Sequence, residues 1–210
     1  MEILLNLAVE DEPSEFLLRV VLNQSKKDYL VGDVYGKRGS GYLKKNLSAF
    51  NNASKGSAHL VLTDLDQIVC APTLIEDWFG CAIQEYHKRC NRNLMFKVAI
   101  REIEAWILAD RLAFSKFVGV RVDRIPLDTD SIENPKEFLV ELAKGSRFRN
   151  IREDLAPRVG DIRRIGPNYN PRLSEFIRDS WRASEARVHS PSLARLIDAL
   201  DSFHPLLRSN

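Results

Sequence analysis

Short apolar runs, each closely followed by acidic residues, constrain the fold of this chain more than any other feature of its sequence. In an open parallel sheet the carboxyl ends of the strands line a single crevice, so carboxylates far apart in sequence can converge there on one or two hard cations. The pattern therefore predicts a divalent-metal site for phosphoryl transfer. In chain order the runs and their acids are Ile3–Val9 with Glu10, His59–Leu62 with Asp64 and Asp66, and Leu94–Ile100 with Glu102 and Glu104.

Length and composition fit one domain with an elaboration. A chain of 210 residues with 44% hydrophobic and 29% charged residues can bury a full core. Ile3–Val9 is too short to cross a membrane and has no basic region before it, so we expect neither a signal peptide nor a membrane partner. We expect the protein to lie in the cytoplasm. The cysteines, Cys70, Cys81 and Cys90, lack a CxxC spacing and are expected to be reduced thiols.

Apolar runs alternate with amphipathic stretches in a βαβ rhythm over the first half of the chain, which predicts an α/β fold with a mostly parallel central sheet. From about Pro126 the strand signal stops and helices opened by prolines follow, which predicts a helical C-terminal extension. We place the domain boundary between 1–120 and 121–210. The further elements expected are a strand at Asp28–Val34 and helices after Asp11, after Gly41 and over Pro72–Cys90, Ile103–Val118, Pro135–Ala143, Pro171–Arg187 and Pro191–Phe203.

The acidic N-terminal motif from Val9 to Glu15 resembles the first strand end of a response-regulator receiver. A receiver places a lysine after a later strand, whereas the third acidic strand end here reads Arg101-Glu102-Ile103-Glu104. A receiver-like signalling or binding module without catalysis is therefore the alternative rather than the leading interpretation.

The motif order more closely resembles the Toprim domain of topoisomerases, primases and OLD-family nucleases. That domain has a glutamate directly after its first strand, as Glu10 is here, and a D-x-D after its third, as in Asp64-Leu65-Asp66. OLD-type members carry further acids that correspond to Glu15 and Glu104, and the stretch from Ile103 to Leu108 also resembles small bacterial Toprim-related proteins. The resemblance covers about residues 1–115. Asp11 departs from it, because a glycine commonly follows the first glutamate.

The resemblance implies a Toprim-like three-layer fold and an endonuclease that depends on Mg²⁺ or Mn²⁺. Two such ions about 4 Å apart can activate water, neutralise the phosphate and capture the leaving oxygen. The implied catalytic residues are Glu10, Asp64 and Asp66. The implied metal ligands are Glu10, Glu15, Asp64, Asp66, Glu104 and Glu102. Glu102 and Glu104 diverge by about 200° if the helix has begun, so one of the two is expected to face the site, and the resemblance favours Glu104.

Basic residues gather in the C-terminal half. The segment from Lys144 to Arg187 holds eleven basic and six acidic residues. Nearly all of the basic residues are arginines, whose planar guanidinium group can donate two parallel hydrogen bonds to phosphate. We expect a nucleic-acid partner there, DNA in preference to RNA, contacted by Lys144, Arg147 and Arg149 and by Arg101 at the strand end. A solvated, salt-bridged helical surface is the competing interpretation of the same residues.

The sequence thus predicts a metal-dependent nuclease, which the resemblance connects with defence against phage or mobile elements. A third possibility is a Toprim subunit that is active only with an ATPase partner. The chain itself has no Walker-type phosphate loop and is not expected to hydrolyse ATP.

Overall fold

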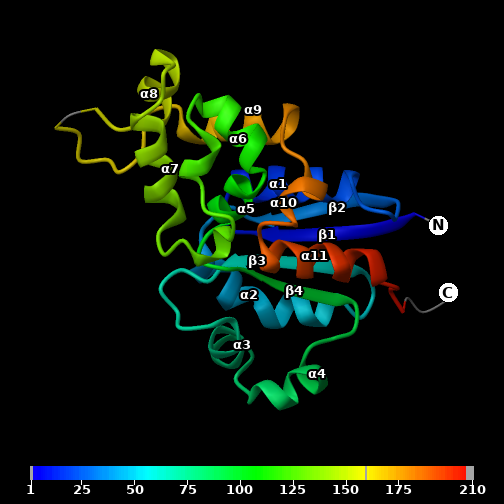
Figure 1. Cartoon of the computed structure of the whole chain (residues 1–210). Helices are drawn as coiled ribbons and strands as arrows, with labels where there is room; N and C mark the ends of the chain where they lie inside the picture. Colours follow the sequence, from blue (N-terminus) through cyan, green and yellow to red (C-terminus); the bar gives the residue numbers. More distant parts are fainter. Residues whose placement is uncertain (1, 159, 207–210) are drawn as a thin grey trace. The chain divides into compact units, whose positions relative to one another are not determined.

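The chain has an α/β fold built on a four-stranded parallel sheet, as Figure 1 shows for the computed structural model, which describes residues 2–158 and 160–206. The sheet order is β2-β1-β3-β4, and each neighbouring pair runs parallel. The predicted α/β class with a parallel central sheet and a helical C-terminal part is confirmed. The strands are β1 (Ile3–Val9), β2 (Tyr29–Gly36), β3 (Ala58–Asp64) and β4 (Leu94–Ala99).

The described residues group into two compact units, Met1–Ile100 with Arg195–Asn210, and Arg101–Ala194. The first contains the sheet and the helices that cover it, and the second is helical throughout the part of it that the structure describes. The predicted boundary near residue 120 falls inside the second unit. Compactness does not define a functional domain, so the division into a catalytic domain and an extension stays a prediction.

Helices cover both faces of the sheet in the first unit. Parallel strands joined by right-handed crossovers put α1 on one face and α2 and α3 on the other, because β1 leads to β2 at one edge while β3 leads to β4 at the opposite edge. Leu43 and Leu47 of α2 and Leu74 of α3 accordingly share a core cluster with Ala8 and Val61 of the sheet. The helices are α1 (Glu12–Asn23), α2 (Ser40–Ala53), α3 (Ala71–Phe79) and α4 (Tyr86–Arg89), with a 3₁₀ turn at Ile83–Glu85.

The second unit packs its helices around two buried tryptophans. The indole N–H of Trp106 donates to the Ser192 hydroxyl at 2.6 Å, and that of Trp181 donates to the Trp106 carbonyl at 3.0 Å. The helices are α5 (Ile103–Ala109), α6 (Arg111–Val118), α7 (Pro135–Lys144), α8 (Arg149–Leu155), α9 (Tyr169–Asp179), α10 (Ala183–Ala186) and α11 (Pro191–Ser202), with 3₁₀ turns at Val122–Arg124 and Thr129–Ser131; α11 continues into the first unit from Arg195.

Three predicted helices are wrong in length because a local feature ends each of them early. The helix predicted over Pro72–Cys90 stops at Gly80, whose φ of 61° is left-handed. The one predicted over Ile103–Val118 breaks at Asp110, whose side chain caps the next helix by accepting from the Ala113 N–H. The one predicted over Pro171–Arg187 breaks between α9 and α10.

In the described residues no helix has both the length and the apolar character needed to cross a bilayer.

A glycine at the end of β2 allows the chain to approach β1 closely. Gly36 has a φ of 103°, and a Cβ built there would lie 2.0 Å from the carbonyl oxygen of Val9. The N–H of Lys37 donates to that same oxygen at 2.9 Å. The close approach therefore sets where the chain leaves β2 relative to the end of β1.

We predict that Gly36→Ala lowers the free energy of unfolding by at least about 2 kcal/mol, because it adds a backbone clash to an unfavourable φ. Gly41→Ala, in α2, is the matched control. Apart from the adjacent residues and the backbone of the helix itself, no atom lies within 4 Å of a Cβ built at Gly41, so stability should hold or rise by up to about 1 kcal/mol. Urea denaturation followed by circular dichroism measures both. Equal stability of the two variants would contradict the prediction.

Candidate functional site

The candidate site lies at the point where the sheet reverses its winding. β1 and β3 are neighbours, yet the chain leaves β1 for one edge of the sheet and β3 for the other. Open α/β sheets bind ligands at such a switch point, beyond the carboxyl ends of the strands. Glu10 directly follows β1, Asp64 is the last residue of β3, and Asp66 lies two residues further. Three of the predicted site residues therefore flank the switch point.

Hydrogen bonds join the two strand ends through one carboxylate. Oε1 of Glu10 accepts from the backbone N–H of Asp64 at 2.8 Å and from the hydroxyl of Thr63. Thr63 is buried, with 1% of its surface exposed, so its hydroxyl is a fixed donor. Sequence reasoning missed Thr63, because a threonine inside an apolar run is an ordinary strand residue. Its position directly before the D-x-D was the only available signal.

The backbone of Glu10 is fixed as well. Its carbonyl oxygen accepts from the N–H of Gly39 at 3.0 Å, just before α2 begins. Because the Gly39 N–H holds its main chain and the end of β3 holds its side chain, the carboxyl group has a defined position at the switch point. The start of α2 lies beside the same residue.

Burial raises the pKa of Glu10 above its usual value. The hydrogen bonds from Thr63 and from the Asp64 N–H lower it, but the negative charges of Asp66 and Asp11 raise it further. The net effect is a carboxyl group that keeps its proton to a higher pH than a free glutamate does. A nearby positive charge would relieve this repulsion.

The D-x-D segment departs from strand geometry between its two acids. The N–H of Leu65 still donates to the Ala99 carbonyl at 2.9 Å, and the Leu65 side chain is buried. Asp66, however, has a φ of 49°, in the left-handed region that aspartate tolerates better than most residues. The two acids are therefore not related by simple strand alternation. Asp64 is half-buried and Asp66 is exposed.

Glu15 forms ion pairs with two basic residues. Lys37 Nζ lies 2.5 Å from Oε2 of Glu15, and Arg19 Nε lies 2.8 Å from Oε1. Burial acts to raise the pKa of Glu15, but the hydrogen bonds from Lys37 and Arg19 outweigh it and lower the pKa. Glu15 is thus a stably ionised group that holds Lys37 against α1. Its predicted role as a metal ligand stays a prediction.

Asp11, the residue that departs from the Toprim pattern, is the N-cap of α1. Its Oδ1 accepts from the backbone N–H of Ser14 at 2.9 Å and from the Ser14 hydroxyl at 2.5 Å. An N-cap aspartate replaces one of the hydrogen bonds that the first turn of a helix lacks. The helix expected after Asp11 is confirmed, and Pro13 lies in its first turn.

In the second unit, Glu102 and Glu104 both interact with Lys136. Oε2 of Glu102 accepts from the Lys136 N–H at 2.8 Å, and Lys136 Nζ lies 3.4 Å from Oε1 of Glu104. That oxygen of the buried Glu104 also accepts from the Tyr169 hydroxyl at 3.1 Å. The two acids do not diverge, because Glu102 precedes the helix in an extended conformation. Their predicted part in the metal site stays a prediction.

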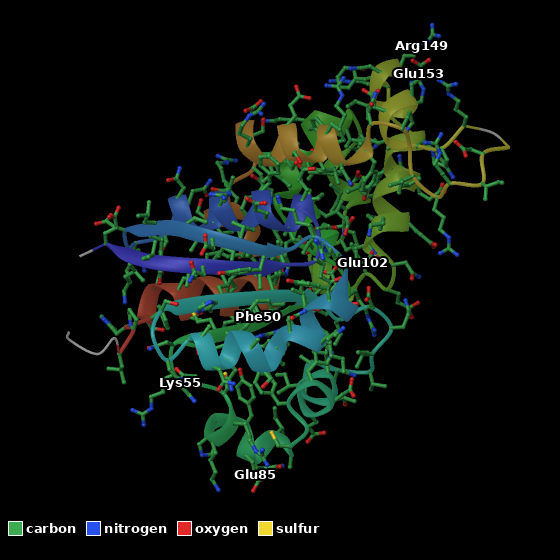
Figure 2. All side chains as sticks on the ribbon, turned by 180° about the vertical axis from the view of Figure 1, so that it is seen from behind. Phe50, Lys55, Glu85, Glu102, Arg149 and Glu153 are labelled. Atoms are coloured by element: carbon green, nitrogen blue, oxygen red, sulfur yellow. The ribbon has the colours of Figure 1, made fainter. Side chains whose placement is uncertain are left out.

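The basic residues predicted to contact nucleic acid at the end of α7 and the start of α8 each interact with a residue close by in the sequence. Lys144 pairs with a glutamate on its own helix at 2.5 Å, and Arg149 pairs with Glu153 at 2.7 Å, at the positions labelled in Figure 2. The Arg147 guanidinium lies over the ring of the next residue, 4.8 Å from its centre. Exposed pairs of this kind contribute little to stability, so a phosphate can replace the glutamates. Arg101 has a left-handed φ of 62°.

The donor atoms at the switch point fit a hard divalent cation in kind, because Glu10, Thr63, Asp64 and Asp66 offer only oxygen. Among the described residues, however, no three histidine, cysteine, aspartate or glutamate side chains are gathered closely enough to hold a metal ion. The carboxylates would have to turn toward one another to share one. The three cysteines are free thiols.

Comparison of the chain with protein-family models, with curated proteins and with solved structures finds no match. The resemblance to Toprim domains therefore rests on the order and placement of the acids alone.

We predict that Glu10→Gln stabilises the metal-free protein at neutral pH. Because the folded-state pKa of Glu10 is raised, its contribution to stability is fully present below its usual value of 4.5 and is lost as the pH rises through the higher folded-state pKa. Glutamine keeps the acceptor for Thr63 and does not ionise. Thermal melts of both proteins in EDTA from pH 4 to pH 8 should show the variant gaining on the wild type as the pH rises.

Glu12→Gln is the control, since Glu12 is an exposed acid two residues after Glu10, at the start of α1. It should follow the wild type at every pH. A Glu10→Gln curve that also follows the wild type would remove the electrostatic argument for this carboxyl group.

Proposed function

We propose that this protein is a divalent-metal-dependent nuclease that cleaves phosphodiester bonds in nucleic acid, DNA in preference to RNA, at a Toprim-type carboxylate site. The observation that supports it most is the hydrogen bonding of the Glu10 carboxylate to the end of β3. It brings two acidic strand ends together at the switch point, where α/β sheets bind ligands.

The residues of the first unit divide the chemistry between them. Asp64 and Asp66 supply carboxylate oxygens for Mg²⁺ or Mn²⁺. Glu10, whose pKa burial raises, is suited to hold a proton or release it near the scissile bond. When bound, one or two of these ions neutralise charge on the phosphate and lower the pKa of a bound water. The buried Thr63 hydroxyl orients Glu10 without itself touching the substrate.

A role in defence against phage or mobile elements, and activity that requires an ATPase partner, belong to this proposal through the Toprim resemblance alone. The receiver-like alternative draws on the strand order, since β2-β1-β3-β4 matches the first strands of flavodoxin-like sheets. It needs a lysine after a further strand. In the parts of the chain that are described, β4 is the last strand, and it is followed by Ile100 and Arg101. The nuclease is therefore the better supported of the two.

We predict that Asp64→Asn and Asp66→Asn each lower Mn²⁺-dependent cleavage of plasmid and single-stranded DNA at least about 100-fold, because each removes a charged ligand. The backbone N–H of Asp64 that holds Glu10 is kept in Asp64→Asn. Cleavage assays should be paired with thermal melts. The melts should show that Mn²⁺ raises the Tm of the wild type but not that of either variant.

Glu12→Gln again serves as the control for a lost surface charge and should cleave like the wild type. Wild-type cleavage by both aspartate variants would refute the assignment. Cleavage without any added divalent ion would refute it as well.

The C-terminal cations allow a separate test. If Arg147 and Arg149 contact phosphates, the double variant Arg147→Ala, Arg149→Ala should bind a labelled oligonucleotide more weakly and with a salt slope that is shallower by up to about two units. Fluorescence anisotropy in an Asp66→Asn background measures both quantities. Unchanged affinity and slope would assign these residues to a solvated helical surface, and would leave the carboxylate site untouched.

A further inference from the structure

A cavity of about 250 Å³ lies in the first unit, among α2, α3 and the end of α4. Drug-sized ligands occupy sites of about 300–1,000 Å³, so this cavity suits a single planar ring system. Figure 2 shows the region around it, with Phe50 on α2, Lys55 in the turn after α2 and Glu85 just before α4. The residues that line it are Leu47, Ser48, Asn51, Trp78, Phe79 and Arg89.

The aromatic walls of the cavity are held in place by the core. Trp78 packs against Phe96 of β4 with ring centres 5.5 Å apart, and Phe79 meets the same ring edge-on at 5.3 Å. Phe79 also meets Tyr86 edge-on at 4.9 Å. Trp78 and Phe79 are each partly exposed and line the cavity. A planar group that enters the cavity therefore finds rigid aromatic surfaces on which to stack.

The polar lining can recognise the edge of such a ring. The amide of Asn51 donates to the Arg89 carbonyl at 2.7 Å and accepts from the Asn91 N–H at 2.7 Å, which fixes the side chain between α2 and α4. An amide has a second donor hydrogen and a second lone pair, so Asn51 retains one of each. The exposed Ser48 hydroxyl adds another donor and acceptor.

The charge around the cavity favours an anionic ligand. None of the six lining residues is acidic, and Arg89 is an exposed cation. The helix α2 carries the exposed Lys44 and Lys45, while Leu43, Leu47 and Phe50 occupy its buried side, and the exposed Lys55 lies in the turn after the helix. Lys44 forms an ion pair with Asp77 of α3 at 2.6 Å, and both side chains of this pair are about half exposed.

The helix α2 connects this cavity with the carboxylate site. Its N-terminal end lies beside Glu10, through the hydrogen bond from Gly39. From Ser40 to Asn51 the helix rises by about 17 Å. A stacked strand rises by about 3.4 Å per nucleotide, so at most about five nucleotides separate a phosphate at the carboxylates from a base in the cavity.

We propose that the cavity binds one unpaired base of the nucleic acid, with the preceding phosphates lying along the lysines of α2. The inference rests on the proposed function and specifies its substrate as a single strand, because a paired base cannot enter a cavity of this kind. Stacking supplies affinity with little dependence on base identity. Arg89 pairs with the phosphate next to the bound base.

The experiment measures binding in an Asp64→Asn background without divalent ions, so it does not depend on cleavage. Ser48→Phe fills the cavity from an exposed position of α2, and Ala49→Phe places the same side chain at the next exposed position, outside the cavity. Ser48→Phe should weaken binding of an eight-residue oligothymidylate about 5- to 100-fold, the range expected for one stacked base. Ala49→Phe should bind like the parent.

Tryptophan fluorescence provides a direct signal. The chain has three tryptophans, and Trp106 and Trp181 are 0% and 2% exposed, so Trp78 is the one that can meet a base. The oligonucleotide should quench the fluorescence of the parent. Trp78→Phe should lose most of the quenching while it keeps most of the affinity.

An abasic residue moved along the oligonucleotide tests whether one base is involved. At a single position it should weaken binding as much as Ser48→Phe does, and the two losses should not add, since both remove one contact. A self-complementary duplex should bind more weakly than the single strand.

Binding and quenching that Ser48→Phe leaves unchanged would overturn the cavity assignment while the nuclease proposal stands. Binding with the expected cavity effects, but no metal-dependent cleavage by the wild-type protein, would overturn the nuclease and retain the cavity. No binding of any oligonucleotide by the parent would overturn both.

Discussion

The carboxylate of Glu10 is the contact on which the arrangement of the first unit depends. β1 and β3 pair only as far as Ala8 and Val61, and beyond that point no ladder of backbone hydrogen bonds joins them. Glu10 continues the connection through its side chain, by accepting from Thr63 and from the Asp64 N–H. An acid in this position is costly to bury, as its raised pKa shows. A purely structural role would be filled as well by a neutral amide, so the retained charge favours a chemical role.

The sequence predicts the strands and the acids at their ends well, because both depend on local patterns. A run of apolar residues such as Ile3–Val9, followed in the chain by a helical pattern, favours a buried strand, and the acid that comes directly after it marks the point where the strand ends. The parallel sheet follows from the alternation with helices. The helix breaks at Gly80 and Asp110 were missed, because each depends on a backbone conformation or a capping bond that periodicity does not report.

Contacts between distant residues were beyond the reach of the sequence. Nothing in the order of residues indicates that Lys37 pairs with Glu15, or that Lys136 serves both Glu102 and Glu104. The arginine count from Lys144 to Arg187 suggested either a nucleic-acid contact or a salt-bridged helical surface, and it could not say that Arg149 pairs with Glu153. Composition gives the net charge of a region, but only the fold decides which charges meet a neighbour.

The two glutamates of the N-terminal motif illustrate how the fold assigns different properties to the same side chain. Glu10 and Glu15 are five residues apart, yet burial and neighbouring acids raise the pKa of the first while Lys37 and Arg19 hold down that of the second. Environments that push two pKa values apart are a hallmark of sites where one group exchanges a proton and the other stays charged. Glu15 is then a permanent anion that positions Lys37 on α1. Under the proposed function, Glu10 is the carboxyl group whose charge would change when a cation or a phosphate binds, so the chemistry of this site is expected to follow Glu10.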